Sequence, residues 1–420
     1  PGEAQGRILV PFPIESSLSG VQRGVTPQEA LWYETTFEVP AAWRRGNDVL
    51  LHFGAVDWRA EVYVNDLLVG SHTGGYTPFS FDITPALSAK GVQKLTVKVT
   101  DSTDKGFQPH GKQVLEPHGI WYTPVTGIWQ TVWIEPVPAA NHIAGITTRS
   151  DIRAGVLSVD VKTARTGSDR VCVTLSADGK TLAERSSMAG QPVHLAVEHP
   201  RLWSPDDPYL YDLTVTLVRD GRVIDRAESY AALREIATGR DANGIERMTL
   251  NGRPLFHFGP LDQGWWPDGL YTAPSDEALA FDVIKTKDLG YNMIRKHVKV
   301  EPARWYYHCD KLGMIVWQDM PSGDRGPQWQ MHNYFTGEEK HRSAESEANF
   351  RKEWKEIIDY LYSSPSIGVW VPFNECWGQF KTQEIVEWTK AYDPSRLVNP
   401  ASGGNHYLTG DILDTHHYPN

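Results

Sequence analysis

The chain has 420 residues, which at about 100–200 residues per domain predicts two to four domains. Apolar residues make up 40% and charged residues 22%, with 36 Gly and 28 Pro, which excludes disordered, collagenous and coiled-coil proteins. The formal net charge is −11, no basic run is dense enough to follow a phosphate backbone, and no stretch reaches the roughly 18 apolar residues of a membrane span, so we expect no nucleic acid or membrane partner.

Residues 1–138 predict antiparallel strands. Runs of alternating or β-branched and aromatic residues, bounded by Gly, Pro, Asn and Asp, occur at 48–53, 60–64, 67–70 and 94–99. The pair Asn65-Asp66 indicates a tight turn between the second and third of these runs. The sequence therefore predicts a β-sandwich of the jelly-roll type, whose start is missing because the chain begins at Pro1.

Residues 139–240 continue the strand pattern without helical periodicity. Strands are expected at 156–161, 171–175 and 210–217. A segment of about 100 residues with this pattern suits an immunoglobulin-like sandwich.

Residues 241–420 change to a pattern of alternating helices and strands. Amphipathic helices are expected at 275–289, 302–312, 345–361 and 382–392, the first with Leu279, Val283 and Ile284 on one face. Short apolar strands near 256, 292, 314, 367, 397 and 411 predict a parallel sheet. This order is typical of a (β/α)8 barrel, in which chemistry collects just past the strand ends.

Aromatic residues are abundant, with 16 Trp, 17 Tyr and 13 Phe, and nine of the Trp follow residue 245. Sugar rings stack on aromatic faces, so this composition favours carbohydrate binding, although core packing is the commoner use of Trp. The three cysteines have no metal-type spacing, and we predict neither a zinc site nor a disulfide framework.

The segment 370–378 is the most informative motif, because an apolar strand runs into Asn374-Glu375 and then Trp377. A carboxyl walled by Phe373 and Trp377 would be partly desolvated, so we expect a raised pKa for Glu375, as a general acid requires. The Asn374 amide could hold a substrate hydroxyl. The alternative is a salt-bridged Glu375 that ends the strand and a Trp377 that only packs.

The motif and several others resemble glycoside hydrolase family two, the group of β-galactosidases, β-glucuronidases and β-mannosidases. The similar segments run in the expected order from about residue 9 to 419; they include 53–65, 72–79, 119–122, 127–130, 202–211 and 250–255. The resemblance implies a sugar-binding jelly roll, an immunoglobulin-like sandwich and a catalytic TIM barrel. About six barrel strands are present, so we expect a fragment that lacks the end of the barrel.

The resemblance also implies a retaining exo-β-glycosidase with two carboxylates about 5 Å apart. Glu375 matches the acid/base position. The family's nucleophile is a Glu at the end of the seventh strand, and no matching segment exists here, so we expect it beyond the given sequence. If the chain truly ended at residue 420, Asp262, Asp319 and Asp414 would be the plausible second carboxylates.

Further site residues follow from the same resemblance. Arg295 matches an Arg that lowers the pKa of the nucleophile; its alternative role is a structural ion pair. His416 neighbours the predicted residues at the last strand end, where one side chain would bond the sugar or the nucleophile. For the Trp residues and the His residues, packing is the competing interpretation. The predicted substrate-binding set is Asn374, Arg295, His297, Asp319, Trp377, His417, Tyr418, Asp262 and Trp265.

The sequence leaves the sugar open. β-Galactosidase activity is the default, β-glucuronidase and β-mannosidase are alternatives, and a non-catalytic carbohydrate-binding protein on this scaffold is a third hypothesis. We predict an oligosaccharide or glycoside partner, a possible homo-oligomer, and neither a cofactor nor a metal. A bacterial periplasmic or secreted location is slightly favoured over a cytoplasmic one.

Overall fold

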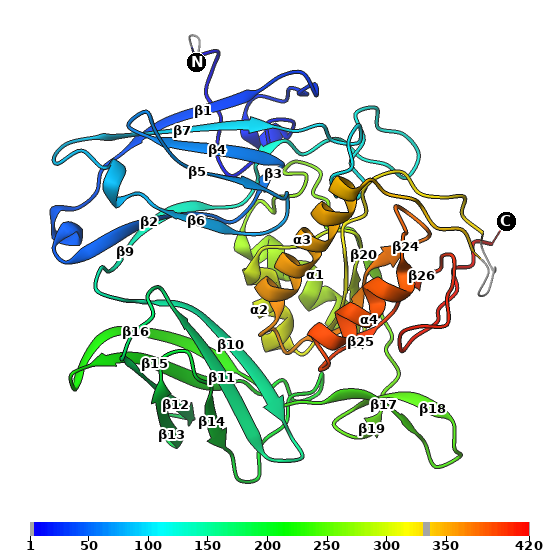
Figure 1. The fold of residues 1–420 in the computed structure, drawn as a ribbon. Helices are drawn as coiled ribbons and strands as arrows, with labels where there is room; N and C mark the ends of the chain where they lie inside the picture. The colour runs from blue at the N-terminus through cyan, green and yellow to red at the C-terminus, as the bar shows by residue number, and fades with distance from the viewer. Residues whose placement is uncertain (1–3, 331–336, 420) are drawn as a thin grey trace.

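A computed structural model describes residues 4–330 and 337–419 and shows three regions in chain order. A first β-sandwich, blue to cyan in Figure 1, and a second sandwich in green lie beside a region of helices and parallel strands coloured yellow-green to red. The fold therefore has the three-part architecture that the sequence predicts.

The first sandwich consists of two main sheets. Their strand orders are β1-β7-β4-β5 and β6-β2-β9, and β3 pairs with β8. Asn65 and Asp66 have φ of 48° and 64°, which confirms the predicted turn between β4 and β5. The strands are β1 Leu31–Phe37, β2 Asn47–Phe53, β3 Val56–Asp57, β4 Arg59–Val64, β5 Leu67–Thr73, β6 Phe79–Asp82, β7 Gln93–Thr100, β8 Gly127–Ile128 and β9 Val132–Pro138.

The second sandwich packs a sheet of order β10-β11-β14 against one of order β13-β12-β15-β16. Alternate residues of β12 and β15 are buried, as expected for strands with one face on the core. The strands are β10 Ile143–Asp151, β11 Val156–Thr163, β12 Arg170–Ala177, β13 Lys180–Met188, β14 Val193–Ala196, β15 Tyr211–Arg219 and β16 Arg222–Ala231.

A small antiparallel sheet links the second sandwich to the third region. It contains β17 Ile236–Arg240, β18 Glu246–Leu250 and β19 Arg253–Pro254. The boundary that we predicted at 240/241 falls between two strands of this sheet. Buried Arg234 ties the second sandwich to the third region. It donates to the carbonyl oxygens of Ile367 at 2.8 Å and Ser395 at 2.9 Å.

The third region is a parallel sheet of order β20-β21-β22-β23-β25, accompanied by helices. The elements are β20 Leu261–Asp262, α1 Asp276–Asp288, β21 Met293–Lys296, α2 Ala303–Leu312, β22 Ile315–Asp319, α3 Ala344–Leu361, β23 Ile367–Val371, α4 Thr382–Tyr392 and β25 Leu397–Val398. A short parallel pair, β24 Phe373–Asn374 and β26 Ala401–Ser402, lies just beyond the ends of β23 and β25. All four predicted helices are confirmed.

Two predicted strands are wrong, and polar side chains explain both. Near residue 256 the Asn292 amide bonds the Phe258 N–H at 2.8 Å and the Phe256 carbonyl at 2.9 Å, so the ladder begins only at Leu261. Near residue 411 the Asp411 carboxylate accepts from the Val398 N–H at 2.9 Å, and residues 411–419 form no strand. In each case a side chain takes one hydrogen bond of the pair, while a backbone bond, from the Asn292 N–H to the Phe258 carbonyl or from the Asp411 N–H to the Val398 carbonyl, remains.

The prediction that Ile284 lies on the buried face of its helix is also wrong. The buried stripe of α1 is Leu279, Ala280 and Val283, whereas Ile284 is 40% exposed. Each residue turns the helix by about 100°, so the position after Val283 points away from the core.

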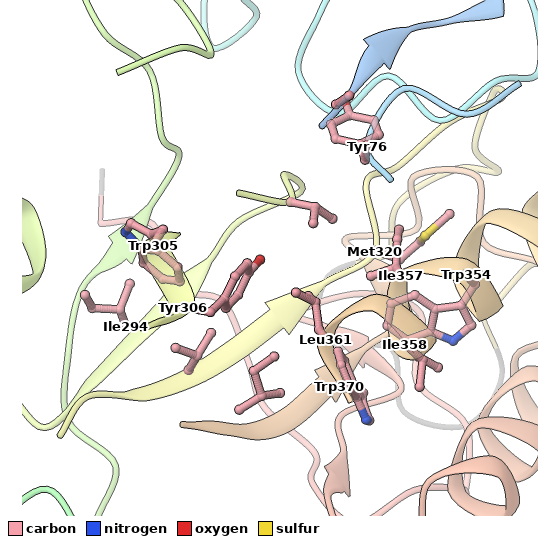
Figure 2. Close-up of a cluster of buried hydrophobic side chains, with 14 of the residues drawn as sticks. Tyr76, Ile294, Trp305, Tyr306, Met320, Trp354, Ile357, Ile358, Leu361 and Trp370 are labelled. Carbon is pink, nitrogen blue, oxygen red and sulfur yellow. The ribbon is translucent and has the colours of Figure 1, made fainter. Parts of the chain in front are cut away.

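The core of the third region continues into the first sandwich. It is built from the barrel strands and their helices, and it includes Tyr76 and Trp129 of the first sandwich. Figure 2 shows Tyr76 on the blue ribbon at one end of this cluster. Trp354, Ile357 and Ile358 extend from the pale orange helix α3. The core of the third region therefore extends onto these residues of the first sandwich, which also has a separate core of its own.

Candidate functional site

Asn374 and Glu375 lie at the carboxyl end of the parallel strands. The Glu375 N–H bonds the Ser402 carbonyl at 3.0 Å, and Glu375 and Cys376 have φ of 44° and 69°. The left-handed backbone turns the chain sharply at the strand end, a strained arrangement that is common at functional sites. Phe373 instead points into the core against Phe350, with ring centroids 5.3 Å apart, so it is not the wall of the carboxyl that we predicted.

The predicted rise in the pKa of Glu375 is wrong. Burial is the largest single influence and raises this pKa, but hydrogen bonds from His416 and Tyr418 outweigh it and lower the pKa. His416 Nδ1 lies 2.6 Å from Glu375 Oε1, and the Tyr418 hydroxyl donates to the same oxygen. The prediction from the sequence took account of burial but not of the hydrogen bonds that His416 and Tyr418 donate to Glu375.

Arg295 organises the polar side chains around Glu375. It bonds Asp319 in a bidentate pair at 3.0 and 2.9 Å and donates to Asn374 Oδ1 at 2.8 Å. The Asn374 orientation follows, because a guanidinium can only donate, and the Nδ2 donor is then left buried with no partner among the described residues.

Asp319 is enclosed by donors. His297 Nδ1 lies 3.0 Å from Asp319 Oδ2, and the Val298 N–H donates to the same oxygen at 3.2 Å. Burial would raise the pKa of Asp319, but the charge of Arg295 and the His297 hydrogen bond hold it below its usual value. Burial also lowers the pKa of His297.

The structure places His416, rather than His417, against Glu375. Arg295 Nη1 lies 3.3 Å from His416 Nε2 and can only donate, so the ring proton sits on Nδ1 and points to Glu375. His417 is exposed and makes no interaction with the residues that the structure describes. Tyr418 is 59% exposed, and burial together with its bond to Glu375 raises its pKa to about 12.

The other carboxylates considered as catalytic partners are engaged elsewhere. Asp262 forms an ion pair with buried Lys296 at 2.9 Å, and Asp414 accepts from the Ser402 hydroxyl at 2.6 Å and from the Gly403 N–H at 3.0 Å. Asp319 is held by Arg295. Each of the three therefore already has a partner among residues 4–330 and 337–419.

The predicted aromatic residues lie where the first sandwich meets the barrel. Trp377 packs on Trp121 with ring centroids 4.7 Å apart, and Trp265 packs on Tyr122 at the same separation. Trp265 also contacts the Tyr271 ring at 4.6 Å. Packing between domains is therefore one function of both predicted Trp residues.

Lys112 is a functional candidate that sequence reasoning missed. It belongs to the segment between β7 and β8, drawn in cyan in Figure 1, which extends from the first sandwich over the barrel. Its Nζ lies 5.8 Å from the Trp377 ring centroid and 5.9 Å from that of Tyr122. In the sequence, residues 119–122 resemble the family segment that closes the first domain. This resemblance does not point to Lys112.

Within the described residues, no group of three or more His, Cys, Asp or Glu side chains is arranged to hold a metal ion. No helix in the same part of the chain is long and apolar enough to cross a membrane.

The fold and the site together define a protein with two β-sandwiches and a β/α-barrel region that carries a Glu at its strand ends. Three family models match in order, over residues 9–138 (glycosyl hydrolases family 2, sugar binding domain), 141–234 (glycosyl hydrolases family 2) and 246–418 (the TIM barrel domain of that family). The chain belongs to glycosyl hydrolases family 2.

Similar proteins carry two activity names. A β-galactosidase of Thermoanaerobacter pseudethanolicus is 26% identical over 82% of this chain and 44% of its own length. A β-glucuronidase of Formosa agariphila is 24% identical over 87% of this chain and 38% of its own length. The chain thus spans less than half of each relative. The structure of a β-D-glucuronidase of Dictyoglomus thermophilum has a TM-score of 0.75 at 20% identity, over 93% of this chain and 68% of that one.

Proposed function

We propose that this chain is the sugar-binding and acid/base part of a retaining exo-β-glycosidase that removes terminal β-linked sugars. The observation that carries the proposal is Glu375 at the strand ends, with a buried unpaired amide beside it on Asn374. Family membership supports the reaction class.

In this mechanism Glu375 protonates the leaving oxygen and later activates water. Its Oε1 already accepts from His416 and Tyr418, so the transferable proton belongs on Oε2. Asn374 Nδ2 donates to a sugar hydroxyl, and Arg295 holds the amide in the orientation that this requires. The nucleophile, a second Glu, would come from sequence beyond residue 420.

The identity of the sugar is the finer part of the proposal. β-Galactoside is the first substrate to test, because that activity is the default for the resembled family and the Thermoanaerobacter relative has that name. β-Glucuronide is the second, because the Formosa agariphila relative has that name.

Glu375→Gln in the complete protein tests the acid/base role. We expect kcat/KM on 4-nitrophenyl glycosides with poor leaving groups to fall roughly 100- to 10,000-fold, because leaving-group protonation is lost. Dinitrophenyl glycosides, which need little protonation, should form the glycosyl-enzyme at a much smaller cost. Glu387→Gln on the exposed face of α4 makes the same chemical change outside the site and should have no effect. An unchanged rate for Glu375→Gln on the poor leaving groups would exclude the role.

A further inference from the structure

A cleft lies between the second sandwich and helix α2 of the third region, away from Glu375. Its volume is about 460 Å³, which falls in the usual range of about 300–1,000 Å³ for small-molecule sites. Helix α2 ends at Leu312 and leads into the start of β22, so the cleft lies near the amino ends of the parallel strands. Glu375 lies at their carboxyl ends, and the cleft is therefore separate from the candidate active site.

Two tyrosines supply the aromatic surface of the cleft. Tyr230 of β16 and Tyr307 of α2 have ring centroids 5.5 Å apart and ring planes at 56° to each other. Pro208 and Leu210 add apolar surface beside them. The Tyr230 hydroxyl donates to Asp310 Oδ2 at 2.7 Å, so this ring is held in place without a ligand. Fixed aromatic rings of this kind offer a face on which the C–H groups of a sugar ring can stack.

Three charged side chains line the same cleft. Asp212 of β15 is paired with Tyr230, and Glu228 precedes Tyr230 by two residues, so both carboxylates share a face of the sheet with this ring. Lys311 of α2 adds an ammonium from the opposite wall, with its Nζ 5.8 Å from the Tyr307 ring centroid. All three charged residues are exposed and therefore accessible to a ligand.

The balance of these charges indicates the class of ligand. Arg226 pairs with Glu228 at 2.9 Å, which leaves the Asp212 carboxylate facing a cleft that also contains the Lys311 ammonium. An anionic ligand would be repelled by the carboxylates, and a cationic ligand by the ammonium. A neutral ligand with many hydroxyl groups suits both, because carboxylates accept hydrogen bonds from hydroxyls and an ammonium donates to them.

We propose that this cleft is a second carbohydrate-binding site, which holds a neutral hexose unit of a longer glycan. Its rings stack on the sugar, and Asp212 and Lys311 bond the hydroxyl groups. The second sandwich would then hold the polymer close to the enzyme while Glu375 acts on a chain end. Binding in the cleft does not depend on Glu375, so this inference goes beyond the proposed function.

Calorimetry on the complete protein tests the proposal, in a Glu375→Gln background that slows cleavage of the probe. The probes are β-1,4-galactotetraose and cellotetraose, and we expect at least one to bind with a dissociation constant of about 1 mM or below. Tyr307→Ala should weaken this binding about tenfold or more, because the stacking surface is lost. Tyr307→Phe keeps the ring and should change the affinity less than about threefold.

Variants of the charged residues test the hydroxyl contacts. We expect Asp212→Ala and Lys311→Met each to weaken binding about three- to tenfold. Lys162→Met is the matched control, because Lys162 is an exposed lysine on β11 in the other sheet of the same sandwich. Thermal unfolding of each variant separates a folding defect from a loss of binding.

Three outcomes would overturn the proposal. The first is no binding of either tetrasaccharide, and the second is an affinity that Tyr307→Ala leaves unchanged, which would place the bound sugar elsewhere. The third is tighter binding of a glucosamine tetramer than of both neutral probes, lost in Asp212→Ala, which would make the cleft a site for cations.

Hydrolysis of small substrates separates this proposal from the proposed function. The rates on 4-nitrophenyl β-D-galactoside and β-D-glucuronide report on Glu375, and Tyr307→Ala in the otherwise wild-type protein should leave kcat/KM within about twofold. If the protein cleaves no glycoside but Tyr307→Ala abolishes tetrasaccharide binding, the hydrolase proposal fails and the cleft proposal stands. If it cleaves glycosides and Tyr307→Ala binds tetrasaccharides normally, the reverse holds.

Discussion

The strand-end site and the interface between the first sandwich and α3 both bury carboxyl groups, but their pKa values move in opposite directions. At the site the pKa values of Asp319 and Glu375 are lowered despite burial. At the interface, burial raises the pKa of Glu353 to about 7, and the pKa of Asp57 is also raised.

The partners explain this difference. Asp319 faces the Arg295 guanidinium, whereas Glu353 accepts from the neutral donors Trp58 Nε1 at 3.0 Å and Asn349 Nδ2 at 2.9 Å. Asp57 accepts from the Gln113 amide at 2.9 Å and lies near the carboxyl of Asp101. The Arg295 cation keeps the pKa of Asp319 low, whereas the neutral donors at Glu353 satisfy its oxygens without outweighing its burial.

Removing the Arg295 cation should leave the buried Asp319 carboxyl without charge compensation, as at the interface. Arg295→Met leaves Asp319 buried without its ion-pair partner, and we expect a loss of about 3–5 kcal/mol in unfolding free energy, measured by urea denaturation. Arg304→Met breaks a pair with Asp276 whose side chains are 61% and 45% exposed, and it should cost less than about 1 kcal/mol. Similar losses in the two variants would contradict the distinction.

The interface should lose stability as the pH rises. Burial raises the pKa of Glu353 from 4.5 to about 7 in the folded protein, so the unfolded chain releases this proton first. The folded state is therefore disfavoured progressively between about pH 4.5 and 7, and Glu353→Gln removes that dependence. We expect the Tm of the variant relative to wild type to rise by roughly 3–6 °C over this range.

Scanning calorimetry at several pH values measures this effect. Glu345→Gln, at an exposed position in the first turn of α3, is the control and should follow the wild type. Parallel Tm curves for wild type and Glu353→Gln would show that Glu353 does not titrate in this range.

The smallest expected effect concerns one donor at the site. Tyr418→Phe removes a hydrogen bond to Glu375, so the pKa of Glu375 should rise by about one unit. Because the acid must be protonated, the alkaline limb of the pH–rate profile should move to higher pH by the same amount. Tyr407→Phe, whose hydroxyl donates to the Gly337 carbonyl, is the control. An unmoved limb in Tyr418→Phe would mean that the bond does not tune Glu375.

Much of the fold is predictable because apolar periodicity and turn chemistry are local. The Asn65-Asp66 turn, the alternation of β12 and the helix ends near Gly290 and Gly313 all follow from neighbouring residues. The missing strands near 256 and 411 depend on Asn292 and Asp411, whose side chains bond backbone groups distant in sequence. No local pattern carries that information.

The site was predictable in composition but not in electrostatics. Asn374, Glu375, Arg295, His297 and Asp319 do converge, because parallel strands bring their carboxyl ends together. The pKa of Glu375 depends on His416 and Tyr418, which follow it by about 40 residues. Lys112 comes from another domain, and its position depends on the fit of Gly111 against Val298.

That fit limits how this protein can be engineered. A minimal enzyme cut from residue 241 onward would lose the glycine contact on the Val298 carbonyl and expose Trp265 and Trp377, which pack on Tyr122 and Trp121. Grafting the barrel onto a different sandwich would meet the same obstacle unless the new domain supplied a glycine at that point. The first sandwich and the barrel are therefore best exchanged together, as a single module.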